Sequence, residues 1–142
     1  MESKREVIAI IDFGSQYGQL IARRVREYKV YSQIYQPEVK ADTLARLGVR
    51  GIILSGGPAS VYAPNAPMCD PALFDLGVPI LGICYGMQIG CKILGADIRP
   101  AQSREYGRTA LAIADHTDLF SGLPEQTTAW MSHGDQVNEL TG

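Results

Sequence analysis

The chain has 142 residues, of which 46% are hydrophobic and 20% charged, with a formal net charge of -2. A chain of this length and composition can bury one sizeable core, so we expect one globular domain. The mixed charges give no basic footprint for nucleic acid. No apolar run suits a membrane span or signal peptide, so we expect a cytoplasmic protein. Three cysteines without zinc-finger spacing indicate neither a disulfide framework nor a structural metal.

The first elements alternate between apolar, β-branched runs and segments with helical periodicity. Runs without polar interruption are typical of strands buried on both faces, and Gly48 marks the end of a helix. The predicted elements are, in order, a strand at 7–12, a helix at 17–28, a strand at 30–35, a helix at 41–47 and a strand at 51–55.

The alternation continues after a loop rich in Gly and Pro at 56–67. A short helix is predicted at 71–76 and an apolar strand at 78–83, and the shorter extended stretches at 109–114 and 127–132 indicate an antiparallel region joined to the sheet. This order predicts an α/β fold: a doubly wound, mostly parallel sheet with helices on both faces and an antiparallel extension. Sites in such folds gather at the carboxyl ends of the strands.

A Gly-x-nucleophile-x-Gly motif carries the chemistry. Gly82, Cys84 and Gly86 fall between a buried strand and a helix, which is the context that a nucleophile elbow requires. Side chains at the two glycines would collide with neighbouring backbone, and the helix amino terminus favours a thiolate at Cys84. Cys69 and Cys91 lack this context and are interpreted as small buried hydrophobic residues.

A second glycine-rich turn, Ser55-Gly-Gly-Pro58, follows another buried strand. Glycines let backbone N–H groups approach a ligand, so the N–H of Gly57 is the candidate partner of the Tyr85 N–H in an oxyanion hole.

These motifs together resemble the class I glutamine amidotransferases, whose Gly-x-Cys-x-Gly elbow is followed two residues later by Gln, here Gln88. The family's fold is flavodoxin-like, and the resemblance covers nearly the whole chain. Within the family, a set of five motifs is similar to that of GMP synthetases, with the last the most discriminating. The five are Asp12-Phe-Gly-Ser-Gln-Tyr17, Ile53-Leu-Ser-Gly-Gly-Pro58, Gly82-Ile-Cys-Tyr-Gly-Met-Gln88, Glu105-Tyr-Gly-Arg108 and Trp130-Met-Ser-His-Gly-Asp135.

The resemblance implies glutamine hydrolysis through a thioester on Cys84, with the N–H groups of Gly57 and Tyr85 holding the oxyanion. Gln88 and Asp135 would bind the amino-acid part of glutamine. The resemblance implies no cofactor or metal in this domain. It implies that the ammonia aminates XMP to GMP in purine biosynthesis, on an ATP pyrophosphatase (synthetase) domain or subunit that uses ATP and Mg²⁺.

The chain departs from the family in one respect. The family's catalytic His and Glu lie in a His-Pro-Glu segment, and no such segment occurs in residues 1–142. We therefore expect an amidotransferase domain that is incomplete at its C-terminus, without the synthetase domain and with an unpaired sheet edge. His116 is interpreted as a surface residue in a polar turn and His133 as a pocket-shaping residue, so neither joins the catalytic set.

Two other interpretations stay open at this point. The chain can be a catalytically incomplete module that binds glutamine or docks on a synthetase. It can also belong among flavodoxin-like cysteine hydrolases or chaperones with a similar nucleophile turn, although Gln88 and the segment 130–135 argue against that class.

Overall fold

The chain consists of two compact units. The computed structural model describes residues 6–15, 17–58, 60–61, 63–114 and 117–139. The first unit comprises Met1–Arg99 and Val137–Gly142, and the second comprises Pro100–Gln136. A two-stranded sheet is only marginally stable by itself, so two compact units do not have to be two independently folding domains. The expectation of one domain therefore stays a prediction.

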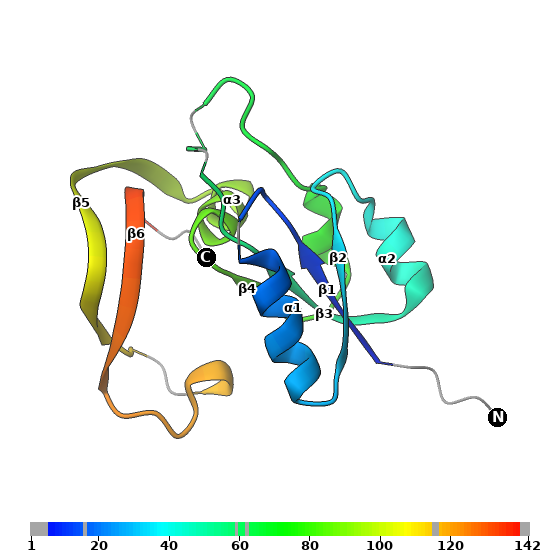
Figure 1. Cartoon of the computed structure of the whole chain (residues 1–142). Coiled ribbons are helices and arrows are strands. Elements are labelled where there is room, and N and C mark those ends of the chain that lie inside the picture. Colours follow the sequence, from blue (N-terminus) through cyan, green and yellow to red (C-terminus); the bar gives the residue numbers. More distant parts are fainter. Residues whose placement is uncertain (1–5, 16, 59, 62, 115–116, 140–142) are drawn as a thin grey trace. The chain divides into compact units, whose positions relative to one another are not determined.

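The first unit is built on a parallel four-stranded sheet in the order β2-β1-β3-β4 (Figure 1). The predicted alternation of strands and helices is confirmed, and α2 has the predicted bounds because Gly48 adopts a left-handed φ of 69° at its end. The elements are β1 (Val7–Ile11), α1 (Gly18–Glu27), β2 (Tyr31–Tyr35), α2 (Ala41–Leu47), β3 (Val49–Leu54), the 3-10 helix η1 (Pro71–Asp75), β4 (Ile80–Gly82) and α3 (Tyr85–Ile93).

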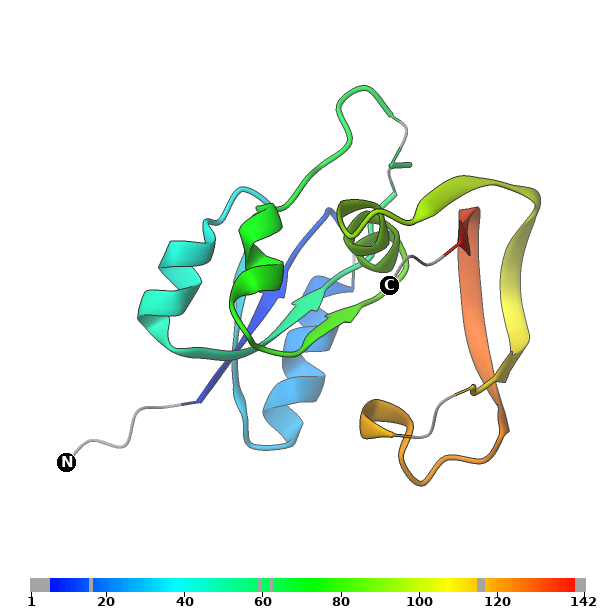
Figure 2. The ribbon, with the colours of Figure 1, turned by 180° about the vertical axis from the view of Figure 1, so that it is seen from behind.

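Helices cover both faces of this sheet, as predicted for a doubly wound fold. Figures 1 and 2 show α1 on one face, with η1 and α3 on the other. Successive strand residues alternate between the faces, so Ile11 of β1 joins a buried cluster with Leu44 of α2 and Ile89 of α3. On the face of α1, the buried hydroxyl of Ser32 donates a hydrogen bond of 3.0 Å to the carbonyl of Ala22.

The antiparallel region forms a sheet of its own. β5 (Asp97–Ala112) and β6 (Gln126–Glu139) pair as a two-stranded antiparallel sheet, with the 3-10 helix η2 (Asp118–Phe120) between them. The predicted antiparallel extension is therefore confirmed, and its two strands pair only with each other among the described strands. β5 also begins earlier than the predicted stretch at 109–114, because the charged residues and the proline near its start hide any apolar alternation.

None of the helices in the described part of the chain combines the length and apolar character that crossing a membrane requires.

One carboxylate joins two of the connecting segments. Asp70 Oδ2 accepts a hydrogen bond of 3.0 Å from the N–H of Ala41, the first residue of α2. Asp70 Oδ1 accepts one of 3.1 Å from the N–H of Ala72 at the start of η1. These N–H groups, Ala41 first, hold the pKa of the Asp70 carboxyl below its usual value. Asp70 therefore ties the loop after β3 to α2.

We predict that Asp70→Ala lowers the midpoint of thermal unfolding by a few degrees at neutral pH, because both N–H groups lose their acceptor. The folded pKa is depressed, so this stabilisation is present above the unfolded pKa of about 3.9 and is lost as the pH falls through the folded value. Thermal melts of the parent, Asp70→Ala and the exposed control Asp75→Ala between pH 7 and pH 2 measure it. An Asp70→Ala deficit that persists undiminished at the lowest pH would contradict the prediction.

Candidate active site

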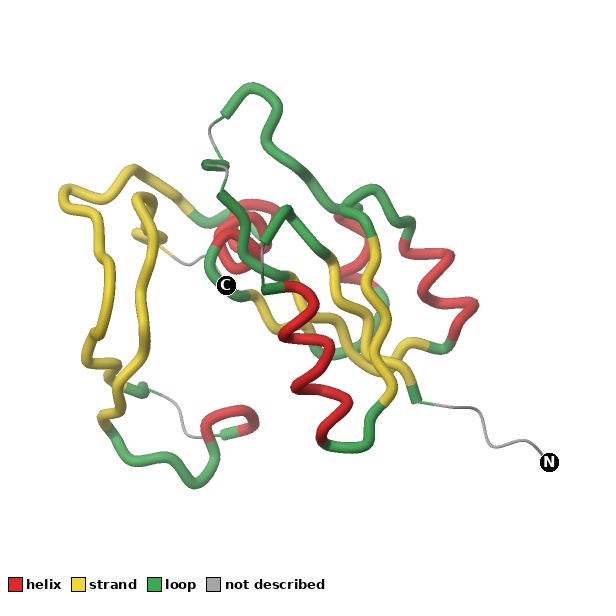
Figure 3. Tube along the Cα trace, viewed as in Figure 1, coloured by secondary structure: helices red, strands yellow, loops and turns green. Residues whose placement is uncertain are grey.

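Three loops meet at the carboxyl edge of the parallel sheet. Ile11 of β1 pairs with Leu54 of β3, and Leu54 pairs with Gly82 of β4. The residues that follow these strands therefore lie at one edge, where the loops leave the strands in Figure 3. The segments after β3 and β4 are the two that were predicted to carry the chemistry.

Cys84 stands at the turn between β4 and α3, as predicted. Its backbone has φ 55° and ψ -116°, a conformation that side chains rarely adopt. Hydrogen bonds fix this turn: the N–H of Ile83 donates to the carbonyl of Leu54 at 2.9 Å, and the N–H of Gly86 donates to the carbonyl of Ile83 at 3.0 Å. Cys84 is the N-cap of α3, so the partial positive charge of the helix amino terminus lies at the thiol.

The two glycines of the elbow have the steric reason that the sequence predicted. A β-carbon at Gly82 would lie 2.6 Å from the Cα of Met87. A β-carbon at Gly86 would overlap the backbone carbonyl of Leu54. The first turn of α3 therefore packs directly on the end of β3, and only glycine permits this approach.

The turn after β3 lies beside Cys84. A β-carbon at Gly56 would be 3.3 Å from the Cβ of Cys84, and one at Gly57 would overlap the carbonyl of Phe13. The fully buried hydroxyl of Ser55 accepts a hydrogen bond of 3.1 Å from the N–H of Phe13 and donates one of 3.0 Å to the carbonyl of Gly56. This turn is therefore locked onto the loop that follows β1.

The two N–H groups predicted for the oxyanion hole belong to segments in contact. Tyr85 is the first residue of α3, so its N–H has no intrahelical acceptor. Gly57 belongs to the turn that packs against Phe13 and adjoins Cys84. The role of these groups in binding an oxyanion stays a prediction, which the local packing supports.

The side chain of Tyr85 has a role that the sequence did not reveal. It is 1% exposed, its ring centroid lies 5.2 Å from that of Phe13, and its hydroxyl donates a hydrogen bond of 2.5 Å to the carbonyl of Pro67. Burial raises the pKa of this hydroxyl, with a smaller contribution from Cys69. A tyrosine within a glycine-rich elbow gives no sequence signal for a contact 18 residues away.

Of the remaining residues considered for the site, only Gln88 has a described side chain. Gln88 lies one turn after Cys84 in α3, is 5% exposed, and its N–H donates to the carbonyl of Cys84 at 3.1 Å. Asp135 and His133 lie in β6, and their side chains are outside the described part of the chain. His116 lies outside the described residues. The substrate-binding roles of Gln88 and Asp135 therefore stay predictions.

The other two cysteines differ from Cys84 in environment. Cys69 is buried, and this burial raises the pKa of its thiol; burial also raises the pKa of the Cys91 thiol. Within the described part of the chain, no three His, Cys, Asp or Glu side chains gather as a metal site would require.

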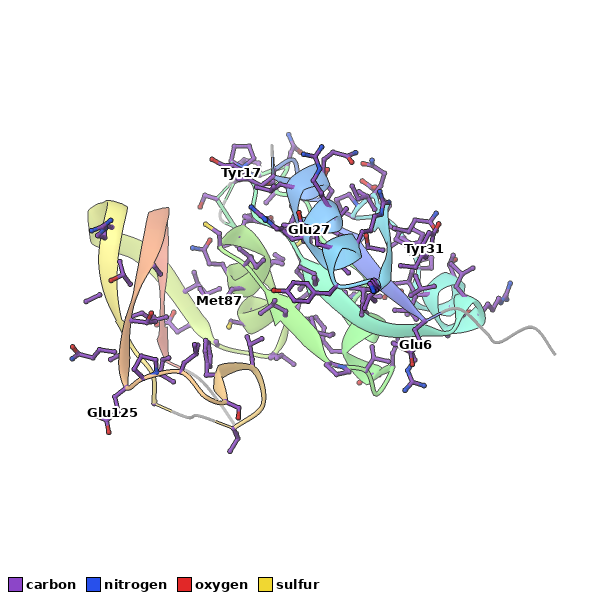
Figure 4. The ribbon with its side chains drawn as sticks, turned by 60° about the horizontal axis from the view of Figure 1, so that its bottom comes forward. Glu6, Tyr17, Glu27, Tyr31, Met87 and Glu125 are labelled. Carbon is purple, nitrogen blue, oxygen red and sulfur yellow. The ribbon has the colours of Figure 1, made fainter. Side chains whose placement is uncertain are left out.

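A cavity of about 570 Å³ lies at the opposite edge of the sheet. Glu6 and Tyr31, labelled in Figure 4, mark the amino ends of β1 and β2, whereas Met87 marks the first turn of α3. The lining residues all flank the amino ends of the strands, away from Cys84, and are Glu6, Gly48, Val49, Arg50, Gly77, Val78 and Pro79. This cavity is therefore separate from the elbow.

The chain resembles known proteins over almost its full length. Residues 9–142 match the family model for glutamine amidotransferase class-I. The chain belongs to the class-I glutamine amidotransferase family. Among solved structures, one described as a candidate GMP synthase component from Thermoplasma acidophilum has 28% identity and a TM-score of 0.83, covering 99% of this chain and 70% of that one. A glutamine amidotransferase from Thermotoga maritima, at 21% identity and TM-score 0.69, shares the fold over 96% of this chain and 64% of its own.

Curated relatives match this amidotransferase at higher identity. A GMP synthase [glutamine-hydrolyzing] from Thermosynechococcus vestitus is 54% identical over 137 residues, which cover 96% of this chain and 26% of that relative. A protein of the same description from Gloeobacter violaceus is 55% identical over 133 residues, covering 94% and 24%. The chain thus spans about a quarter of the length of the curated relatives it matches.

The loop after β1 also belongs to the site. In the sequence it was recognised only as one of the family motifs. Asp12 Oδ1 accepts hydrogen bonds from the N–H groups of Gly14 at 2.9 Å and Ser15 at 3.1 Å. This loop also contains Phe13, whose backbone carbonyl packs against Gly57. An Asp followed by Phe-Gly-Ser directly after a strand is a turn signal that could have located it.

We predict that Gly86→Ala destabilises the protein by about 1–3 kcal/mol, because its new methyl group must displace the backbone at Leu54. Gly90→Ala in the same helix is the control, since its β-carbon would lie 3.3 Å from the movable ring of Phe74. Urea unfolding monitored by circular dichroism gives both free energies. Equal unfolding free energies in the two variants would disprove the close-approach explanation.

We predict that iodoacetamide at pH 7–8 alkylates Cys84 at least about tenfold faster than Cys69 or Cys91, whose raised pKa values leave less thiolate. Peptide mass spectrometry over time measures the three rates, and Cys84→Ser provides the control. Comparable labelling of Cys69 in the folded protein would contradict this order.

Proposed function

We propose that the chain hydrolyses glutamine through Cys84 as the glutaminase part of a GMP synthase. The observation that carries the proposal is the strained elbow, which holds Cys84 at the amino terminus of α3 and beside Gly56. The identity of 54% and 55% to glutamine-hydrolysing GMP synthases, over 96% and 94% of this chain, supports it.

In the proposed reaction the Cys84 thiolate attacks the side-chain amide carbon of glutamine. The C=O electron pair moves to oxygen, where the N–H groups of Gly57 and Tyr85 stabilise the charge. The C–N bond breaks as the nitrogen gains a proton, which releases ammonia and leaves a γ-glutamyl thioester. Water then attacks the thioester, yielding glutamate and the free thiol.

We further propose that the ammonia is consumed on a synthetase domain or subunit, which aminates XMP with ATP and Mg²⁺. The names of the curated relatives support this setting, since each is a GMP synthase. Gln88 and Asp135 are proposed to bind the amino-acid part of glutamine, and the cytoplasm is the proposed location.

A second candidate is a module that binds glutamine or docks on a synthetase without turnover. The favouring observation is that residues 1–142 contain no His-Pro-Glu segment, where the family resemblance leads us to expect the base and its orienting carboxylate.

The deciding measurement is ammonia release from glutamine by this chain and by a version extended past Gly142 with the downstream residues of a GMP synthase, each beside Cys84→Ala. We expect the extended chain to release ammonia and residues 1–142 alone to be slower by at least about 100-fold, because residues 1–142 contain no His-Pro-Glu segment to supply the base. The Cys84→Ala variants should be inactive.

Turnover of the short chain through Cys84 would instead point to His133 as the base. If the extended chain remains inactive even with its synthetase partner, ATP, Mg²⁺ and XMP, the binding-module candidate is favoured and the glutaminase proposal fails.

A further inference from the structure

The structure assigns to the Tyr85 side chain a positioning role in the oxyanion hole. We propose that its hydroxyl and ring hold the loop that carries Gly57 at a fixed distance from the N–H of Tyr85 itself. The inference rests on the proposed function, since it concerns the same two N–H groups.

The long connection between β3 and η1 is held to neighbouring elements along its length, in addition to the bond from Asp70 to α2. At its start, Ser55 binds the loop after β1 through the N–H of Phe13. In its middle, the carbonyl of Val61 accepts a hydrogen bond of 3.2 Å from Lys92 Nζ of α3. Near its end, the carbonyl of Pro67 accepts the bond from the Tyr85 hydroxyl. The bonds to Val61 and Pro67 both come from α3, the helix whose N-cap is Cys84.

Tyr85 links this connection directly to Cys84. Its backbone follows Cys84 directly, while its ring packs on Phe13, whose carbonyl lies against Gly57. A shift of the ring therefore moves Phe13 and the Gly57 turn relative to the N–H of Tyr85. An oxyanion hole needs its donors preorganised, because a misplacement of about 1 Å can lower a rate 100-fold.

The Tyr85 hydroxyl is suited to a hydrogen bond that persists across the working pH range. Burial raises its pKa, so it stays protonated and donates to Pro67 throughout the range in which glutamine hydrolysis is measured. A phenylalanine would keep the ring and the backbone N–H and would lose this bond alone. Tyr85→Phe is therefore a specific test of the hydroxyl.

The chain offers a matched control in Tyr35. Its hydroxyl is buried and has no hydrogen-bond partner in the described part of the structure. Tyr35→Phe thus removes the same atom from a half-buried tyrosine without removing a bond. Phe13→Leu is a second test variant, because it removes the opposite ring of the Tyr85 contact.

The test uses the extended, glutamine-hydrolysing polypeptide. We expect Tyr85→Phe to lower kcat about tenfold with KM for glutamine within about twofold of the parent, because a displaced oxyanion donor acts on the transition state. Phe13→Leu should shift kcat in the same direction, and Tyr35→Phe should match the parent. The rate at which iodoacetamide alkylates Cys84 should be unchanged in Tyr85→Phe, because the substitution of iodide by the thiolate passes through no oxyanion. Hydrogen exchange in residues 56–69 should accelerate in Tyr85→Phe.

Equal kcat in Tyr85→Phe and Tyr35→Phe would overturn the inference, as would a fall in kcat matched by an equal fall in Cys84 alkylation, which would place the effect on the nucleophile. A parent without glutaminase activity would contradict the proposed function. In that case hydrogen exchange decides the inference: faster exchange in residues 56–69 of Tyr85→Phe supports the anchoring, and unchanged exchange overturns it.

Discussion

The close approach of the first turn of α3 to the end of β3 is the constraint on which the site depends. Gly86 lies against the carbonyl of Leu54 so closely that no β-carbon fits. The same carbonyl accepts the N–H of Ile83, so the chain must reverse sharply at Cys84. The strained φ of Cys84 is the consequence, and tertiary packing on both sides sustains it.

Buried polar groups transmit this constraint to the neighbouring loops. Ser55 is fully buried, and its hydroxyl both accepts from Phe13 and donates to Gly56. A buried hydroxyl without partners would be costly, so this pair of bonds favours one arrangement of the turn beside Cys84. Tyr85 adds a second cross-connection through Phe13 and Pro67. Three loops that are distant in sequence thus form one structure around the thiol.

The proposed function assigns the nucleophile to Cys84 and the oxyanion donors to the N–H groups of Gly57 and Tyr85, and it assigns no proton donor. A thiol that attacks an amide also needs a proton donor for the departing nitrogen. From the family resemblance we expect the His that exchanges this proton, and its orienting Glu, in a His-Pro-Glu segment, and residues 1–142 contain no such segment. The curated relatives are about four times as long as the matched region, which leaves room for both the base and the synthetase.

The sequence alone determined the order of strands and helices in the parallel unit, the end of α2 at Gly48, and the elbow at Cys84. These features depend on local periodicity and on glycine sterics, which are written in neighbouring residues. Tertiary structure alone decided that β5 and β6 form a separate sheet, that Ser55 locks two loops, and that Tyr85 reaches Pro67. Such pairings join residues far apart in the chain. Many strands or polar groups could serve as the partner of a given strand or hydroxyl, so only tertiary packing selects the actual partner.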